Sequence, residues 1–248
     1  MLRCFALALA NLFLTPLAVH AAWWLAIDPA PAWSEADWSS AQLLPPAQTN
    51  RQALVHVYAA RTGRWKGIFA HHSWIVVKER GAMGYSRFDM VAWGRPVKIN
   101  NWAPDARWYG HPPILVGAVE GSAAEPLIPK IRAAVARCPY NRSGGYAVWP
   151  GPNSNSFVAF VLTEVPEIGI ALPPTAVGKD WRPFPDLIGL TPSHTGIALS
   201  LGGLIGFTVG WVEGLELNLL GLVVGIDLRR PALKLPGFGR IGVSAVVG

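Results

Sequence analysis

The run HHSWIVVK at residues 71–78 says most about the fold, because two histidines open a stretch rich in β-branched and aromatic side chains. That composition predicts a buried strand over residues 73–78. Further stretches of the same kind lie at residues 54–58, 85–93 and 114–119. A loop with Gly81 and Gly84 separates the strands at 73–78 and 85–93, and this spacing predicts an antiparallel hairpin.

Two helices are predicted after these strands. Residues 125–136 place apolar side chains on one face at helical spacing and charged side chains off it. Residues 154–164 contain an apolar run that would face the core on every side, as in a buried helix. An antiparallel sheet followed by helices predicts an α+β core over residues 51–190.

The last part of the chain contains a tandem repeat. Residues 196–205 recur as residues 214–223, an offset of 18 (214 − 196). Leucine alternates with small or polar residues in both copies, which is the period of a strand. We predict a glycine- and leucine-rich β segment over residues 191–248, with its leucine face covered by the domain or by a membrane surface. Leu217→Asp should then destabilise the protein far more than Asn218→Asp.

A membrane-spanning helix is the alternative for this part of the chain. Residues 187–212 contain no Asp, Glu, Lys or Arg, and a spanning helix needs only about 20 apolar residues. Pro192 and frequent glycines interrupt the run, and Glu216 in the second copy would be costly in lipid.

The N-terminus resembles an export signal. Arg3 precedes an apolar run over residues 5–19, and small residues surround Ala21. We predict a signal peptide over residues 1–21, cleaved after Ala21, with retention as an N-terminal anchor as the alternative. Residues 22–50 are rich in Ala, Pro, Trp and Ser and predict a linker with one short helix at 34–44. The expected location is extracytoplasmic, in the periplasm or cell envelope.

Composition narrows the classes of partner. Hydrophobic residues make up 51% of the chain and charged residues 15%, which excludes disorder. The net charge is +6, but the basic residues are scattered, so we expect no nucleic-acid partner and instead attraction to an acidic membrane surface. Cleavage would leave Cys138 as the only cysteine, which allows neither an intrachain disulfide nor a zinc site. We predict no cofactor and no metal.

Two short patterns suggest chemistry. His72 opens a predicted strand, and Ser154 opens a predicted buried helix directly after Asn153. If residues 80–83 close the hairpin, Asp89 lies across from Trp74 and diagonal to His72, where its carboxylate could hold the imidazole. Glu79 and Arg87 are expected behind Asp89.

The stretches YAART (58–62), WKGIF (65–69), HSWI (72–75) and GPNSN (151–155) resemble an uncharacterised bacterial domain family, domain of unknown function number 3750. More remotely, the chain is similar to circularly permuted papain-like enzymes such as the lecithin–retinol acyltransferase kin. That resemblance implies a papain-like core with His72 as base and Ser154 as nucleophile. The enzymes carry cysteine at the nucleophile position, so serine here is a departure from their pattern.

Three hypotheses follow. The first is a serine-type hydrolase or acyltransferase acting on amide or ester bonds of an envelope peptide or lipid. It requires His72 to take the hydroxyl proton during attack, because a helix N-terminus cannot ionise serine as it can cysteine. The second is an inactive relative that binds in the same cleft, with His72 as a packed histidine and Ser154 as a helix cap. The third is a structural membrane-associated protein built around the leucine-rich segment.

Overall fold

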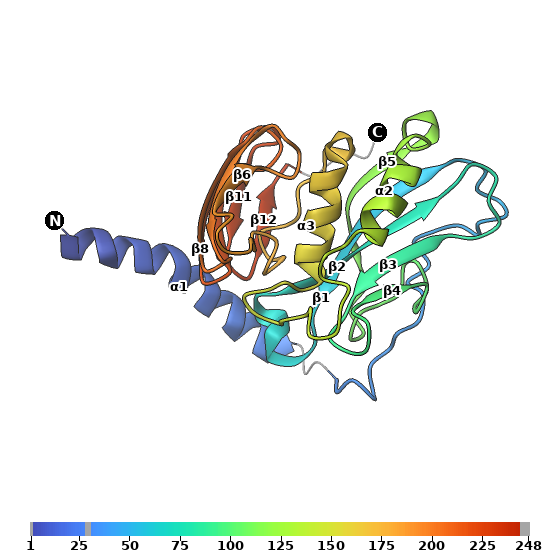
Figure 1. The fold of residues 1–248 in the computed structure, drawn as a ribbon. Coiled ribbons are helices and arrows are strands. Elements are labelled where there is room, and N and C mark those ends of the chain that lie inside the picture. The colour runs from blue at the N-terminus through green and yellow to red at the C-terminus, as the bar shows by residue number, and fades with distance from the viewer. Residues whose placement is uncertain (1, 28–30, 244–248) are drawn as a thin grey trace.

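The computed structural model describes residues 2–27 and 31–243 and contains two antiparallel sheets and three α-helices in that part of the chain (Figure 1). The predicted α+β fold with a C-terminal β-rich segment is confirmed. Residues 28–30 of the predicted linker and 244–248 of the predicted C-terminal segment lie outside the described residues.

The first sheet has the strand order β4-β3-β2-β1-β5. Its strands are β1 (Leu54–Arg61), β2 (His71–Lys78), β3 (Ser86–Met90), β4 (Val97–Ile99) and β5 (Ile114–Glu120). The predicted hairpin is the pair β2–β3, in which Ile75 lies opposite Phe88. Val55, Val57, Ile75 and Val77 point into the core because alternate residues of a strand share a face.

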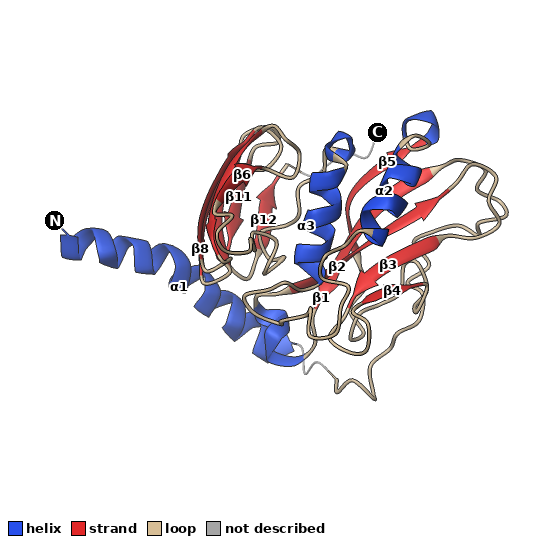
Figure 2. Ribbon diagram, in the orientation of Figure 1, coloured by secondary structure: helices blue, strands red, loops and turns tan. Residues whose placement is uncertain are grey.

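Two helices cover this apolar face (Figure 2). Helix α2 (Leu127–Ala136) buries Ile128, Ile131 and Val135 at helical spacing. Helix α3 (Ser154–Glu164) packs against β2 and α2, and its apolar middle is buried on nearly every side. Both helices therefore match the predicted ranges closely, because the apolar residues whose spacing predicted them are the ones that are buried. Short 3-10 helices lie at Arg64–Ile68, Gly121–Ala123 and Pro166–Ile168.

The second sheet has the order β12-β11-β10-β9-β8-β7-β6 and is built from successive hairpins. Its strands are β6 (Ile188–Leu190), β7 (Gly196–Leu201), β8 (Ile205–Gly210), β9 (Gly214–Leu219), β10 (Leu222–Asp227), β11 (Ala232–Leu235) and β12 (Gly239–Gly242). The strand period of the tandem repeat is confirmed, and the alternative of a continuous helix over residues 187–212 is wrong.

The polarity of this sheet runs opposite to that of an ordinary half-exposed sheet. The polar residues Ser200, Thr208, Glu216 and Asn218 are buried, while Leu199 and Phe207 on the other face are exposed. The polar face is turned toward α3, with which it encloses a small cavity of about 170 Å³. The domain thus does not cover the leucine face.

This arrangement corrects the expected contrast between Leu217→Asp and Asn218→Asp. Leu217 lies on the outer face and is partly exposed, whereas Asn218 is buried and donates from Nδ2 to Asp180 Oδ2 at 2.9 Å. An aspartate at position 218 would set two carboxylates side by side in a buried place. Asn218→Asp is therefore not the mild change that the sequence alone suggested.

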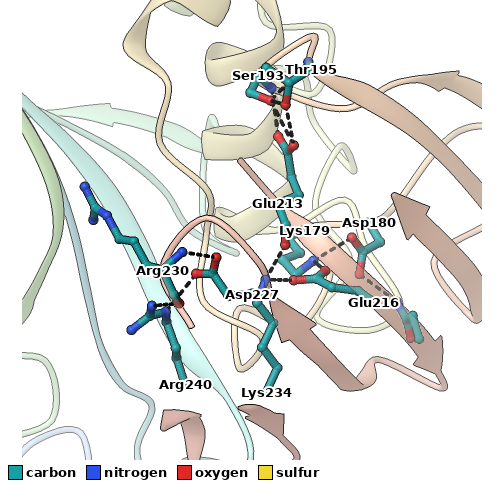
Figure 3. Close-up of polar contacts among 11 residues, drawn as sticks. Lys179, Asp180, Ser193, Thr195, Glu213, Glu216, Asp227, Arg230, Lys234 and Arg240 are labelled. Carbon is teal, nitrogen blue, oxygen red and sulfur yellow. Dashed lines mark hydrogen bonds and ion pairs between the residues drawn. The ribbon is translucent and has the colours of Figure 1, made fainter. Parts of the chain in front are cut away.

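A buried ion network holds the polar face to the rest of the protein (Figure 3). Glu216 accepts hydrogen bonds from Lys179, in the segment after α3, and from Lys234 of β11. Lys179 also pairs with Asp180 at 2.8 Å. Burial alone would raise the pKa of Glu216, but the two lysines lower it, so the carboxylate stays ionised.

The N-terminal helix α1 (Leu2–Ile27) is longer than the predicted signal segment and is not separate from the domain. Its buried residues Phe13, His20 and Trp24 fall on one stripe at helical spacing, and the helix lies against β10 and β11. Arg61 connects β1 to both partners of this contact: it donates to Gly237 O at 2.6 Å and lies 3.3 Å from His20 Nε2 of α1.

The predicted short helix at residues 34–44 does not form. This segment has turns and one isolated bridge, Ser40 with Ala106. The Asp105 carboxylate accepts the N–H of Leu43 at 2.6 Å and the hydroxyl of Ser40 at 2.7 Å. A carboxylate far away in the sequence thus accepts hydrogen bonds from backbone N–H groups that a helix would have used. Local sequence patterns cannot reveal such a contact.

Candidate active site

His72 and Asp89 form a buried pair on neighbouring strands. His72 on β2 is 4% exposed, and its Nε2 lies 2.8 Å from Oδ1 of Asp89 on β3. The β2–β3 register places Asp89 opposite Trp74, which gives the diagonal relation to His72 that the hairpin predicted. Behind the carboxylate, Arg87 donates from Nε to Oδ2 at 2.6 Å and lies 3.9 Å above the Trp74 ring.

The charges of this pair define the tautomer of His72. Burial alone would raise the pKa of Asp89, but Arg87 and the hydrogen bond to His72 lower it, so Asp89 is a carboxylate. Burial lowers the pKa of His72, and its hydrogen bond to Asp89 only partly opposes this effect. An ionised Asp89 can only accept, so Nε2 of the neutral ring carries the proton and Nδ1 keeps its lone pair.

Stacking on one tryptophan ring fixes the plane of the His72 imidazole. The Trp108 ring is stacked on His72 with centroids 3.7 Å apart and an interplanar angle of 4°. Trp108 lies 36 residues further along the chain (108 − 72), in a loop without regular structure. Sequence reasoning missed this contact because no local period connects the two residues.

Ser154 is the first residue of α3, and the helix start is fastened to β2. Asn153 is the N-cap and forms a capping box with Ser156. The Asn155 side chain donates to His71 O at 2.9 Å and to Val177 O at 2.8 Å. These bonds connect the start of α3 to the residue before His72, which explains why two motifs far apart in the sequence meet.

His72 and Ser154 line one cavity of about 590 Å³. Its walls are mainly aromatic and aliphatic, with Trp65, Trp93 and Trp149 among them. Within the described residues no hydrogen bond joins Ser154 to His72, and no acceptor takes the Ser154 backbone N–H. That N–H lies at the positive end of an 11-residue helix, where a developing oxyanion would be stabilised.

Other candidate residues are placed elsewhere. Glu79, expected behind Asp89, instead pairs with Arg132 of α2 at 2.8 Å. Its position at the end of β2 turns it toward the helix and away from the buried pair. No cluster of three or more His, Cys, Asp or Glu suited to a metal ion occurs among residues 2–27 and 31–243.

We expect His72 to be a neutral imidazole at pH 7 with its proton on Nε2. Because burial lowers its pKa, the unfolded chain takes up a proton before the folded chain as the pH falls below 6.5, so His72 removes stability in that range. Two-dimensional ¹⁵N NMR of the imidazoles, with the exposed His194 as reference, measures the tautomer directly. A doubly protonated His72 at pH 7 would contradict the assignment of Nδ1 as the free base.

The fold and the cavity define an α+β protein with a candidate Ser–His–Asp site. A family model described as "Protein of unknown function (DUF3750)" matches residues 52–181, just over half of the chain, and the protein belongs to this family. The matched region contains His72, Asp89 and Ser154 but neither α1 nor the C-terminal sheet. No curated protein and no solved structure matches the chain.

Proposed function

We propose that the protein is a hydrolase or acyltransferase that cleaves amide or ester bonds at the cell envelope, with a papain-like arrangement in which serine replaces cysteine. The observation that carries this proposal is the buried His72–Asp89 pair, whose histidine lines one cavity together with a serine at a helix start. Helix α1 supports the location, because Leu7–Ile27 is long and apolar enough to cross a membrane.

In this mechanism the Ser154 oxygen attacks the substrate carbonyl carbon while His72 Nδ1 takes the hydroxyl proton. Asp89 holds the ring and stabilises the imidazolium that forms. The oxyanion is held by the Ser154 N–H and the helix dipole until the bond to the leaving group breaks, and His72 returns the proton to that group. Water, or a second acceptor in a transferase, then releases the acyl group from Ser154.

The walls of the cavity indicate the substrate class. Aromatic and aliphatic side chains dominate the lining, and a cavity of about 590 Å³ lies within the usual range for small-molecule sites. Such a surface suits an acyl chain or another apolar group. Lys66 is among the lining residues, and its ammonium could meet an anionic head group.

A fluorophosphonate probe tests the nucleophile, because it reacts covalently with activated serines. The wild-type chain should be labelled at Ser154, and both Ser154→Ala and His72→Gln should lose the label. Ser73→Ala is the matched control, since its buried hydroxyl makes no hydrogen bond among the described residues and it lies beside His72 on β2. Labelling is read by mass spectrometry, and thermal unfolding checks that each variant folds.

A binding protein without catalysis is the second candidate. The missing hydrogen bond between Ser154 and His72 favours it, although catalytic hydrogen bonds often tighten only with substrate present. An unlabelled wild-type chain that still binds a fluorescent fatty acid in the cavity would support the binding protein. Trp149→Ala should then weaken binding, because Trp149 lines the cavity.

A further inference from the structure

The outer face of the C-terminal sheet is a continuous apolar surface. Leu199 lies opposite Phe207 in the β7–β8 pair, and Ile226 lies opposite Leu233 in the β10–β11 pair. The exposed side chains on this face are Ile188, Leu190, Ile197, Leu199, Leu201, Ile205, Phe207, Val209, Ile226, Leu233 and Ile241. They extend from the first strand of the sheet to the last.

No strand position on this face carries a charge, because the alternation of the strands directs every charged residue inward. Glu216, Asp227, Lys234 and Arg240 all belong to the opposite face. Soluble monomers rarely expose contiguous apolar patches larger than a few hundred Å². A surface that crosses all the strands of a sheet therefore requires a partner.

Helix α1 indicates what that partner is. It lies against β10 and β11, and Val224, an outer-face residue by register, is buried there. Beyond this contact the N-terminal half of α1 projects away from the sheet, on the side opposite α3 (Figure 1). Leu7, Leu12 and Leu14 on the projecting half are exposed. The helix has the length and composition of a membrane span over Leu7–Ile27, and its projecting N-terminal half thus leaves the protein from the apolar face.

One turn at the edge of the sheet carries a side chain that is typical of a membrane interface. Trp211, in the turn between β8 and β9, is 60% exposed, and tryptophan is enriched at the level of lipid head groups. Arg229 and Arg230, in the turn between β10 and β11, are exposed but belong to the opposite side of the sheet, where they line a groove with β5 and Arg229 donates to Gly169 O at 3.4 Å.

We propose that the outer face of the C-terminal sheet lies on a lipid bilayer, with the projecting half of α1 inserted beside it. The proposal extends the envelope location proposed above and needs no catalysis. The cavity that contains His72 and Ser154 is also lined by Leu17 of α1 and by Leu220 and Leu222 at the β9–β10 turn. A docked sheet therefore places the cavity beside the bilayer, from which an acyl chain can enter.

Spin labels test this contact in the full-length chain. With Cys4→Ser and Cys138→Ala as background, a nitroxide is attached to Phe207→Cys on the outer face. The control is Ile99→Cys on β4, because Ile99 is similarly exposed but belongs to the other sheet. Both proteins are inserted into vesicles of phosphatidylcholine and phosphatidylglycerol. Electron paramagnetic resonance then measures collision with oxygen, which enters lipid, and with a nickel chelate, which does not.

The expected result is a severalfold higher ratio of oxygen to nickel collisions at position 207 than at position 99. Equal ratios at the two positions would overturn the proposal, since α1 would then be inserted with the sheet held in water. Spin–spin broadening at position 207 that disappears on dilution with unlabelled chain would also overturn it, because a second copy would cover the face. Fluorophosphonate labelling is a separate readout, so either proposal can fail alone.

Discussion

Glu216→Ala is expected to lower the free energy of unfolding by about 3–5 kcal/mol, the usual cost of removing one partner from a buried ion pair. Glu216 and Lys234 are each 3% exposed, and the carboxylate also accepts from the buried Lys179. Alanine would leave Lys234 without a carboxylate partner, although Asp180 would still hold Lys179. Urea denaturation followed by tryptophan fluorescence measures the change.

Two further variants sharpen this test. Asp186→Asn removes a carboxylate that is mainly exposed and 4.0 Å from Arg182, so it should change stability by at most about 1 kcal/mol. Glu216→Leu combined with Lys234→Met removes both charges and should recover much of the stability, because apolar replacements of a buried pair are often neutral. A loss for Glu216→Ala as small as that for Asp186→Asn would show that water reaches the network.

Asp89→Ala is expected to have a similarly large effect, about 3–5 kcal/mol, since it leaves a buried guanidinium without its carboxylate. Arg87 is 1% exposed. Without Asp89, its guanidinium would keep only the hydrogen bond that it donates to Ala103 O, among the acceptors in the described residues. The variant should also lose fluorophosphonate labelling, because nothing then holds the His72 ring proton. Glu125→Ala is the control, since its pair with Arg80 is exposed and contributes at most about 1 kcal/mol.

The stability that Asp89 contributes should depend on pH in a defined direction. Its pKa in the folded protein is below the ordinary value of 3.8, so the contribution is fully present above that value. As the pH falls below 3.8 the unfolded chain takes up the proton first, and the contribution is lost. The difference in unfolding free energy between the wild type and Asp89→Asn should therefore be constant at neutral pH and shrink in acid. An increase in acid would contradict the assignment of Asp89 as the ionised partner.

The sequence was most informative where a local pattern and burial agree. The start of α3 at Ser154 could be predicted because Asn153 is a strong cap and an apolar run follows. The position of Asp89 could be predicted because the hairpin register follows from the loop between two clear strands. Both predictions depend on residues close together in the chain.

The remaining features depend on contacts that no local period encodes. Trp108 reaches His72 from a distant loop, and Asp105 removes the donors of the expected helix at residues 34–44. The leucine period correctly predicted strands in the C-terminal sheet, but a period does not say which face the domain will cover. The polar face lies inside because Glu216 pairs there with two buried lysines, Lys234 of the sheet and Lys179 outside it.

The packing of α1 has a consequence for the order of events during biosynthesis. His20 is 1% exposed, and the bond after Ala21 lies within a helical stretch that continues to Ile27. Proteases cleave segments that are exposed and free to unfold locally. If residues 1–21 are a signal peptide that is cleaved after Ala21, the peptidase would have to act before the helix docks, and cleavage and folding would compete in time. The faster of the two would then decide whether the mature protein keeps Leu17 as a wall of its cavity.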